Sequence, residues 1–290
     1  MSSTSAFVKK LASNDRKTRN AALEALRRYL SSKTIKPESL SLLEMEKLWR
    51  GLYFSMWFCD KAKAQERLAE SLGRIYSDCI KSPQAFLQFV RAFNLIMIKE
   101  WSSIDQWRID KYYLLIRRIL RHNFRYLKSS GWDSDLVSKW TAVLSETILS
   151  GSDKVPVALP YHMCDIYLDE LELVLFEALE EQDEEAEEKE EEVDRDDPDY
   201  GEKKIGDLEA AKIAIASEAN VRDLIQLFAD LSQSAKLKTL REKIKEEVLD
   251  DSRLTEWGVL EQADGEKDGD DEDEDDDHDH EEEEEEWKGF

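Results

Sequence analysis

The chain has 290 residues, of which 41% are hydrophobic and 37% are charged, and its formal net charge is −25 at pH 7. This hydrophobic fraction is enough for a buried core, but no apolar run approaches the roughly 20 residues that a transmembrane helix needs. Residues 1–10 also lack the apolar stretch of a signal peptide. These features predict a soluble, intracellular protein with no membrane partner.

The charge is distributed unevenly along the chain. Residues 1–160 carry 27 Lys and Arg against 16 Asp and Glu, whereas residues 181–290 carry 14 against 44. The overall negative charge therefore hides a basic front half. Such asymmetry is typical of proteins that bind nucleic acid or basic proteins.

Helical periodicity dominates the first 180 residues, and strand-like alternation is hard to find there. The predicted helices cover about residues 15–31, 37–58, 62–80, 83–100, 103–128, 133–151 and 160–180. Capping residues or a proline stand near six of their starts, at Asp15, Pro37, Asp60, Ser82-Pro83, Ser103 and Asp133. Short connections between these helices predict an all-α fold, and an irregular HEAT-like array of antiparallel helices is favoured over a compact bundle.

Two acidic segments interrupt the pattern and divide the chain. Residues 181–204 cannot bury enough apolar surface to fold, so they are predicted to form a disordered loop after a body spanning residues 1–180. Helical periodicity returns over 205–232 and 235–250. Because two helices alone make a poor core, residues 205–258 are expected to pack back on the body. Residues 259–290 are predicted to be an acidic disordered tail.

The sequence lacks the motifs of common enzyme classes. It contains no Gly-rich phosphate loop, no nucleophile elbow and no His-Glu-x-x-His motif. Its three cysteines match no zinc-site spacing and are expected to be buried, reduced thiols. His122, which stands among basic residues, is expected to face the surface or RNA. The prediction is a non-enzymatic protein without a metal or cofactor.

The predicted helix over residues 103–128 carries the main candidate site. At about 100° per residue, its basic residues fall on one arc roughly 120° wide, opposite an apolar face. The arc consists of Lys111, Arg117, Arg118, Arg121, Arg125 and Lys128. A face of nearly one sign suits RNA phosphates, and the alternatives are an acidic protein partner or an ordinary solvated face. A second and weaker cluster consists of Lys9, Lys10, Arg16, Lys17, Arg19, Arg27 and Arg28.

The predicted helix over residues 37–58 is rich in aromatic residues near its end. Trp49, Tyr53 and Trp57 recur every four residues, and Phe54 and Phe58 widen the same face. A helix that is apolar nearly all round is usually buried between neighbours. This segment is therefore predicted to be core rather than a platform for base stacking.

Several strings of residues are more specific than any short motif. They are Leu48–Trp57 with Asp60-Lys61; Trp101, Ile104-Asp105, Arg108, Asp110–Tyr113 and Arg117; and Ile166–Leu171. Through these strings the chain resembles the eukaryotic ribosomal RNA-processing protein 1 family of nucleolar proteins. The similarity covers about residues 5–180, with a fainter echo from Leu224 to Trp257.

This resemblance implies a non-catalytic nucleolar factor of early large-subunit precursors, which supports processing and folding of pre-ribosomal RNA. The implied partners are pre-ribosomal RNA and other large-subunit assembly factors, including a Brix-domain protein, with ribosomal proteins as further candidates. The family supplies no catalytic residues. The alternative function, from a different class, is an acidic-tailed chaperone for basic proteins such as histones or ribosomal proteins.

Residues 287–290, Trp-Lys-Gly-Phe, follow the acidic run 264–286. Two aromatic side chains in a solvated tail gain nothing unless a partner binds them. Trp287 and Phe290 are therefore candidate docking residues, and a chance sequence is the alternative.

Overall fold

A computed structural model of the protein describes residues 3–36, 40–189 and 200–260, and all regular secondary structure in these ranges is helical. The predicted all-α class is confirmed. None of the helices in these ranges has both the length and the apolar character required to cross a bilayer.

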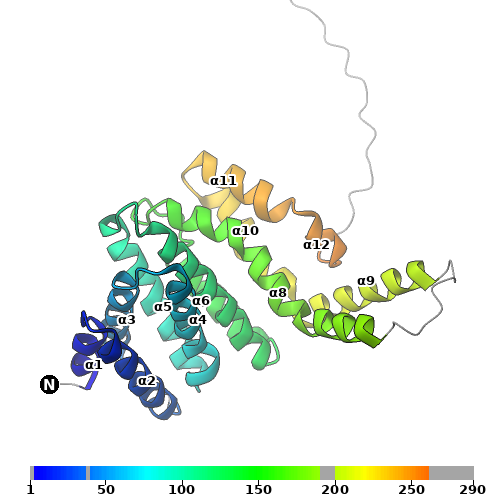
Figure 1. Ribbon diagram of the computed structural model, residues 1–290. Helices are drawn as coiled ribbons and strands as arrows, with labels where there is room; N and C mark the ends of the chain where they lie inside the picture. The colour runs from blue at the N-terminus through cyan, green and yellow to red at the C-terminus, as the bar shows by residue number, and fades with distance from the viewer. Residues whose placement is uncertain (1–2, 37–39, 190–199, 261–290) are drawn as a thin grey trace, which may run out of the picture. The chain divides into compact units, whose positions relative to one another are not determined.

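The helices alternate between two layers, and most of them pack on the next helix of their own layer. One layer contains α1 (Ser3–Leu11), α3 (Leu42–Trp57), α5 (Pro83–Glu100), α7 (Ser134–Ser145) and α10 (Val221–Ser234). The other contains α2 (Arg16–Lys33), α4 (Ala62–Arg74), α6 (Ile109–Ser129) and α8 (Ala158–Lys189). Contacts run from α1 through α3, α5 and α7 to α10, and from α4 through α6 to α8 (Figure 1). Stacked antiparallel pairs of this kind form the predicted HEAT-like array.

Three helix starts follow the capping residues in the sequence. The side chains of Asp15, Ser82 and Asp133 each accept a hydrogen bond from the backbone N–H three residues later, at 2.8, 3.3 and 2.9 Å. These bonds satisfy donors that have no partner within the helix. The predicted caps at these three positions are confirmed.

Three other predicted starts are wrong or lie outside the described residues. Pro37 is among the residues not described, and α3 begins at Leu42 because Ser41 and Glu44 form a capping box. Asp60 is not a cap, since α4 begins after Lys61 without a side-chain cap. Ser103 ends a short 3₁₀ turn (Trp101–Ser103), and α6 starts only at Ile109.

Asp105 explains the late start of α6. Its carboxylate accepts a hydrogen bond from the backbone N–H of Trp107 at 3.0 Å and pairs with the Arg108 side chain. A local bond to the backbone two residues on stabilises a turn that competes with the helix. The capping-box spacing at Ser103 was therefore misleading.

The predicted loop over residues 181–204 is helical at both ends. α8 runs to Lys189 and α9 (Tyr200–Glu218) begins at Tyr200, so only residues 190–199 lie outside the description. Glu, Ala, Gln and Lys are good helix formers. Their abundance is therefore compatible with a helix. Residues 261–290 of the predicted tail are not described.

Two further helix boundaries differ from the prediction. α1 was not predicted at all, and the single helix expected over 205–232 is divided into α9 and α10. The chain turns at Asn220, which has a φ of +49°. This left-handed conformation is one that Asn adopts more readily than most residues.

The C-terminal helices pack on the rest of the array. α10 contacts α7, and α11 (Lys238–Ile244), its π-helical continuation (Lys245–Leu249) and α8 contact one another. The Tyr167 hydroxyl of α8 donates to the Leu224 carbonyl of α10 at 2.7 Å. Arg253 of α12 (Ser252–Glu256) donates to Asp169 and Glu172 of α8 at 3.1 and 3.0 Å.

The aromatic helix α3 lies mainly in the core, as predicted. Trp49 is 1% exposed, and its ring centroid lies 5.1 Å from that of Phe89 and 4.7 Å from that of Phe93, both on α5. Trp57 is different, because it is only partly buried and is covered by the guanidinium of Arg108, 4.5 Å from the ring centroid. The core positions on this face are therefore Trp49 and Tyr53, whereas the predicted core position of Trp57 is only partly buried.

Glycine allows the closest approach between α4 and α6. A Cβ atom added at Gly73 would lie 2.4 Å from Cδ2 of His122 and 2.9 Å from the backbone oxygen of Arg118. No other residue fits there without movement of α6. This close packing holds the basic side of α6 near α4.

Candidate functional site

The main candidate site, the basic arc of α6, lies between neighbouring helices of the array. α6 packs between α4 on one side and α8 on the other. Every side chain from residue 111 to residue 128 is buried or half-buried, and Lys111 is 4% exposed. The arc is therefore only partly open to solvent, mainly at Arg117 and Arg125, whose side chains are 35% and 30% exposed.

Three arginines of the arc pair with carboxylates of α8. The pairs are Arg117 with Asp169 and Glu170, Arg121 with Glu170, and Arg125 with Glu177. The Glu170 side chain is completely buried and receives both Arg117 and Arg121, the latter at 2.5 and 3.0 Å. Without them a buried carboxylate would be severely destabilising, so these pairs fix α8 against α6.

The other members of the arc also have partners within the protein. Arg118 lies 3.6 Å from Glu66 and 3.8 Å from Glu70, both on α4. Lys111 donates to the carbonyls of Trp57 and Cys59 at 2.7 and 3.0 Å. Lys111 thus supplies hydrogen-bond donors to carbonyl groups at the end of α3 that have no donor within the helix.

Lys128 completes the arc at the other end of α6. It donates to the carbonyls of Val174 and Leu175 at 2.5 and 3.3 Å. All six members therefore have intramolecular partners. The arc therefore forms a layer of ion pairs and hydrogen bonds between neighbouring helices, and phosphate binding by its partly exposed arginines remains a prediction.

His122 is likewise not on the surface. Its side chain is 1% exposed, with Nε2 3.0 Å from Glu70 and Nδ1 3.0 Å from the Ser77 hydroxyl. Burial lowers the pKa of His122, and the hydrogen bond to Glu70 acts in the opposite direction. The expected surface or RNA-facing role of His122 is wrong.

The weaker N-terminal cluster is the one that reaches solvent. Lys9, Lys10, Arg16 and Lys17 are exposed, and in the part of the chain that the structure describes they form no ion pair. Arg19 differs, because it donates to the carbonyl of Ser13 at 2.8 Å and fixes the turn between α1 and α2. Except for Arg28 further along α2, the exposed cations of the predicted sites therefore gather at the end of α1 and the start of α2.

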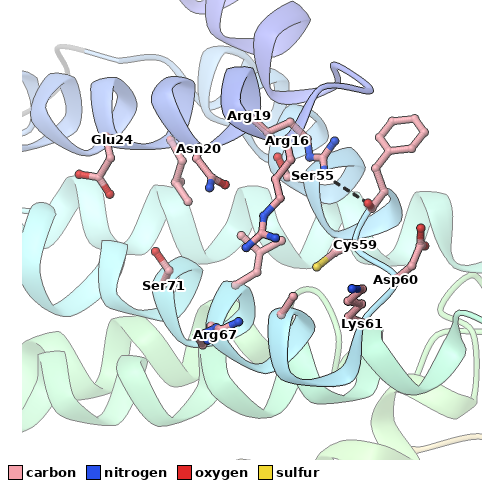
Figure 2. A pocket seen from close by; sticks show the side chains of 14 residues that line it. Arg16, Arg19, Asn20, Glu24, Ser55, Cys59, Asp60, Lys61, Arg67 and Ser71 are labelled. Atoms are coloured by element: carbon pink, nitrogen blue, oxygen red, sulfur yellow. Dashed lines mark hydrogen bonds between the residues drawn. The ribbon is translucent and has the colours of Figure 1, made fainter.

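A pocket of 580 Å³ adjoins this cluster. It lies between α2, the end of α3 and the first three turns of α4, and Figure 2 shows the side chains around it. Arg16 extends from α2 into the space above α4 (Figure 2). The lining includes four cationic side chains, Arg16, Arg19, Lys61 and Arg67, and two carboxylates, Glu24 and Asp60.

Sequence reasoning missed Lys61 and Arg67. Together with Ala64, Leu68 and Ser71 they recur every three or four residues, so they share one face of α4. That spacing was visible in the sequence. What it did not indicate is that this face lies opposite Arg16 of α2.

The three cysteines occupy different environments. Cys79 and Cys164 are buried, at 3% and 2% exposure, whereas Cys59 is half-buried and lines the pocket. Burial raises the pKa of the Cys59 thiol, and the nearby Lys111 opposes this. Among the described residues, no group of three or more His, Cys, Asp or Glu side chains is arranged to hold a metal ion. The candidate docking residues Trp287 and Phe290 lie outside the described residues.

His162 of α8 gives a prediction about pH. Its Nε2 lies 3.1 Å from the Tyr113 carbonyl, which can only accept, so this nitrogen carries hydrogen. Burial lowers the pKa of His162. As the pH falls below about 6.5, His162 is therefore protonated more readily in the unfolded chain than in the folded protein. The protein loses stability over this range, until the pH reaches the lowered pKa of His162 in the folded state.

His162→Gln keeps an amide donor but does not titrate. Urea unfolding at pH 7.5, 6.5, 5.5 and 5.0 is expected to show a smaller loss of stability in this variant than in the natural protein. The difference between the two profiles isolates His162 from His122 and the carboxylates. Parallel profiles would mean that the folded pKa of His162 is not lowered.

Comparisons with known proteins agree on one family. The family model described as nucleolar protein, Nop52, matches residues 2–290. Ribosomal RNA processing protein 1 homolog B of Homo sapiens is 37% identical over 169 residues, which are 58% of this chain and 22% of that protein. Homolog A of Homo sapiens is 32% identical over 174 residues, 60% of this chain and 38% of that protein. The homolog of Caenorhabditis elegans is 32% identical over 166 residues, which are 57% of this chain and 41% of that protein.

The chain thus spans less than half the length of these curated relatives. The similarity to them is nevertheless found in animals as distant as human and nematode, and the family model extends it to nearly every residue. The chain belongs to the Nop52 family of nucleolar proteins, the ribosomal RNA processing protein 1 family.

Proposed function

We propose that this protein is a non-catalytic scaffold of early large ribosomal subunit precursors in the nucleolus, where it supports processing and folding of pre-ribosomal RNA. The observation that carries the proposal is the family match over residues 2–290, together with relatives named for ribosomal RNA processing. The expected partners are pre-ribosomal RNA and large-subunit assembly factors, including a Brix-domain protein, with ribosomal proteins as further candidates.

The arrangement of charge is compatible with a scaffold. The cations of α6 hold α4, α6 and α8 together, and fixed helices present a surface of constant shape. The exposed cations Lys9, Lys10 and Lys17 are free to contact phosphates. Phosphate contacts position a protein on RNA and make binding dependent on salt.

The proposal is tested by purifying the tagged full chain from nucleolar extract and sequencing the bound RNA. Large-subunit precursor RNA and assembly factors are expected to copurify. In vitro, replacing Lys9, Lys10 and Lys17 by Ala should reduce the salt slope of RNA binding by about 0.7–0.9 for each phosphate that the variant no longer neutralises. Recovery of neither precursor RNA nor assembly factors would contradict the scaffold.

The acidic composition of residues 264–286 favours a second candidate, a chaperone for basic proteins such as histones or ribosomal proteins. The two functions differ in the part of the chain they require. Capture of free ribosomal proteins or histones that is abolished when residues 264–290 are deleted would support the chaperone. Capture of precursor particles that survives this deletion supports the scaffold.

A further inference from the structure

We propose that the pocket between α2 and α4 binds one nucleotide of a single-stranded RNA segment. This inference deepens the proposed function, on which it rests for the presence of RNA. The pocket volume of 580 Å³ falls within the roughly 300–1,000 Å³ of small-molecule sites. Its lining combines cations, carboxylates and apolar groups, which is what phosphate, ribose and base together require.

The cations that line the pocket have free hydrogen-bonding capacity. The side chains of Arg16, Lys61 and Arg67 are exposed and have no ion pair or hydrogen bond with other described residues. This distinguishes them from the arginines of α6, which carboxylates of α4 and α8 already neutralise. An arginine without a partner can bind phosphate oxygens through two parallel N–H groups.

The positive end of α4 lies beside the pocket. Lys61 is the N-cap residue of this helix, and its side chain makes no capping bond. The first backbone N–H groups of a helix have no intrahelical acceptor and carry partial positive charge. In α4 the N–H of Ala64, which lines the pocket, already donates to the Lys61 carbonyl at 2.8 Å. The remaining first N–H groups, of Ala62 and Lys63, adjoin Lys61 but are not part of the lining, so the α4 start contributes only its partial positive charge.

The remaining lining suits a nucleoside better than a bare anion. Leu23, Phe58 and Leu68 provide apolar surface against which a base can pack, and the guanidinium plane of Arg16 can stack on it. Glu24 and Asp60 would repel a free phosphate. They can, however, accept hydrogen bonds from base amino groups or from the ribose 2′-hydroxyl.

Positive charge continues beyond the pocket. Lys17 follows Arg16 on α2, Lys63 follows Lys61 on α4, and all of these side chains are exposed. Lys9 and Lys10 end α1 immediately before the turn into α2. A phosphopeptide carrying one phosphate would use only the pocket, whereas an RNA strand would also use these flanking cations. The longer track of charge favours RNA.

The test uses the full chain and fluorescein-labelled octauridylate. Arg16→Ala combined with Arg67→Ala is expected to weaken binding at least about tenfold at 50 mM salt, because the variant cannot form two charge-assisted hydrogen bonds to phosphate. The salt slope should fall by about 1.4, at about 0.7 for each single-strand phosphate. The matched control is Lys99→Ala with Lys154→Ala, which removes the same charge from exposed side chains outside the pocket lining and outside both basic clusters.

Cys59 provides a second readout that reports occupancy directly. It lines the pocket, while Cys79 and Cys164 are buried and serve as internal references. Octauridylate is expected to slow alkylation of Cys59 by N-ethylmaleimide at pH 8 in the natural chain and in the control variant. The Arg16→Ala, Arg67→Ala variant should show no protection. Inorganic phosphate and a phosphoserine peptide are the competing probes.

Equal RNA binding by the pocket variant and its control, with unprotected Cys59, would overturn the inference. Protection by the phosphoserine peptide but not by octauridylate would overturn it in favour of a peptide site. Failure of the proposed function can be distinguished from failure of the pocket inference, because the proposed function is tested by copurification with precursor particles. Octauridylate protection of Cys59 without such copurification would retain the pocket and reject the scaffold.

Discussion

Trp49→Ala is expected to lower the free energy of unfolding by about 3–5 kcal/mol, because it removes a large ring from a site with no access to solvent. Trp49 is 1% exposed and contacts Phe89 and Phe93 of α5 as well as Tyr76, which continues α4. The cavity would lie where the two layers meet. The free energy of unfolding of a typical domain is only about 5–15 kcal/mol. Urea unfolding of the variant should therefore show a large shift in midpoint.

Two other tryptophans serve as matched controls. Trp57 is on the same helix but only partly buried, so Trp57→Ala should cost about 1–2 kcal/mol. Trp107 is 85% exposed, and Trp107→Ala should change stability by no more than about 0.5 kcal/mol. Equal losses at Trp49 and Trp57 would show that the packing described for α3 is incorrect.

Glu170→Ala is expected to cost about 3 kcal/mol. Breaking a buried ion pair typically costs about 3–5 kcal/mol. The lower end applies because the side chains of Arg117 and Arg121 remain 35% and 19% exposed and can recover water. Thermal and urea unfolding measure this loss, and no change in stability would mean that α8 is not held by this carboxylate.

Glu177→Ala is the control on the same helix. Glu177 also pairs with an arginine of α6, but its side chain is 42% exposed, so this pair should contribute no more than about 1 kcal/mol. Glu170→Gln retains the shape of the side chain and one hydrogen-bond acceptor. Its loss of stability should therefore lie between those of Glu170→Ala and Glu177→Ala. Similar losses for Glu170→Ala and Glu177→Ala would indicate that burial does not distinguish the two pairs.

The strings that carry the family resemblance contact one another. Tyr112 donates its hydroxyl hydrogen to the Tyr53 carbonyl at 3.0 Å, and Lys111 donates to the Trp57 carbonyl. Arg117 pairs with Asp169, which lies in the third string. The strings are therefore joined across α3, α6 and α8, and these contacts help to hold the array together.

Much of the local structure could be predicted from the sequence. Helical periodicity indicated the all-α class, and Asp15, Ser82 and Asp133 marked helix starts, because a cap depends only on residues three positions apart. The same local reasoning predicted the burial of Trp49. It was wrong at Ser103, where Asp105 forms a competing turn only two residues later.

The candidate site depended on the tertiary structure. Periodicity correctly placed the basic residues of α6 on one arc, but a single-sign arc has the same sequence pattern whether it faces RNA or a neighbouring helix. Only packing brought Glu170 of α8 and Glu70 of α4 to that arc, across about 50 residues of chain in each case. Packing also placed Arg67 opposite Arg16. Charge is a property of the sequence, whereas the partner that neutralises it is decided by which helices meet.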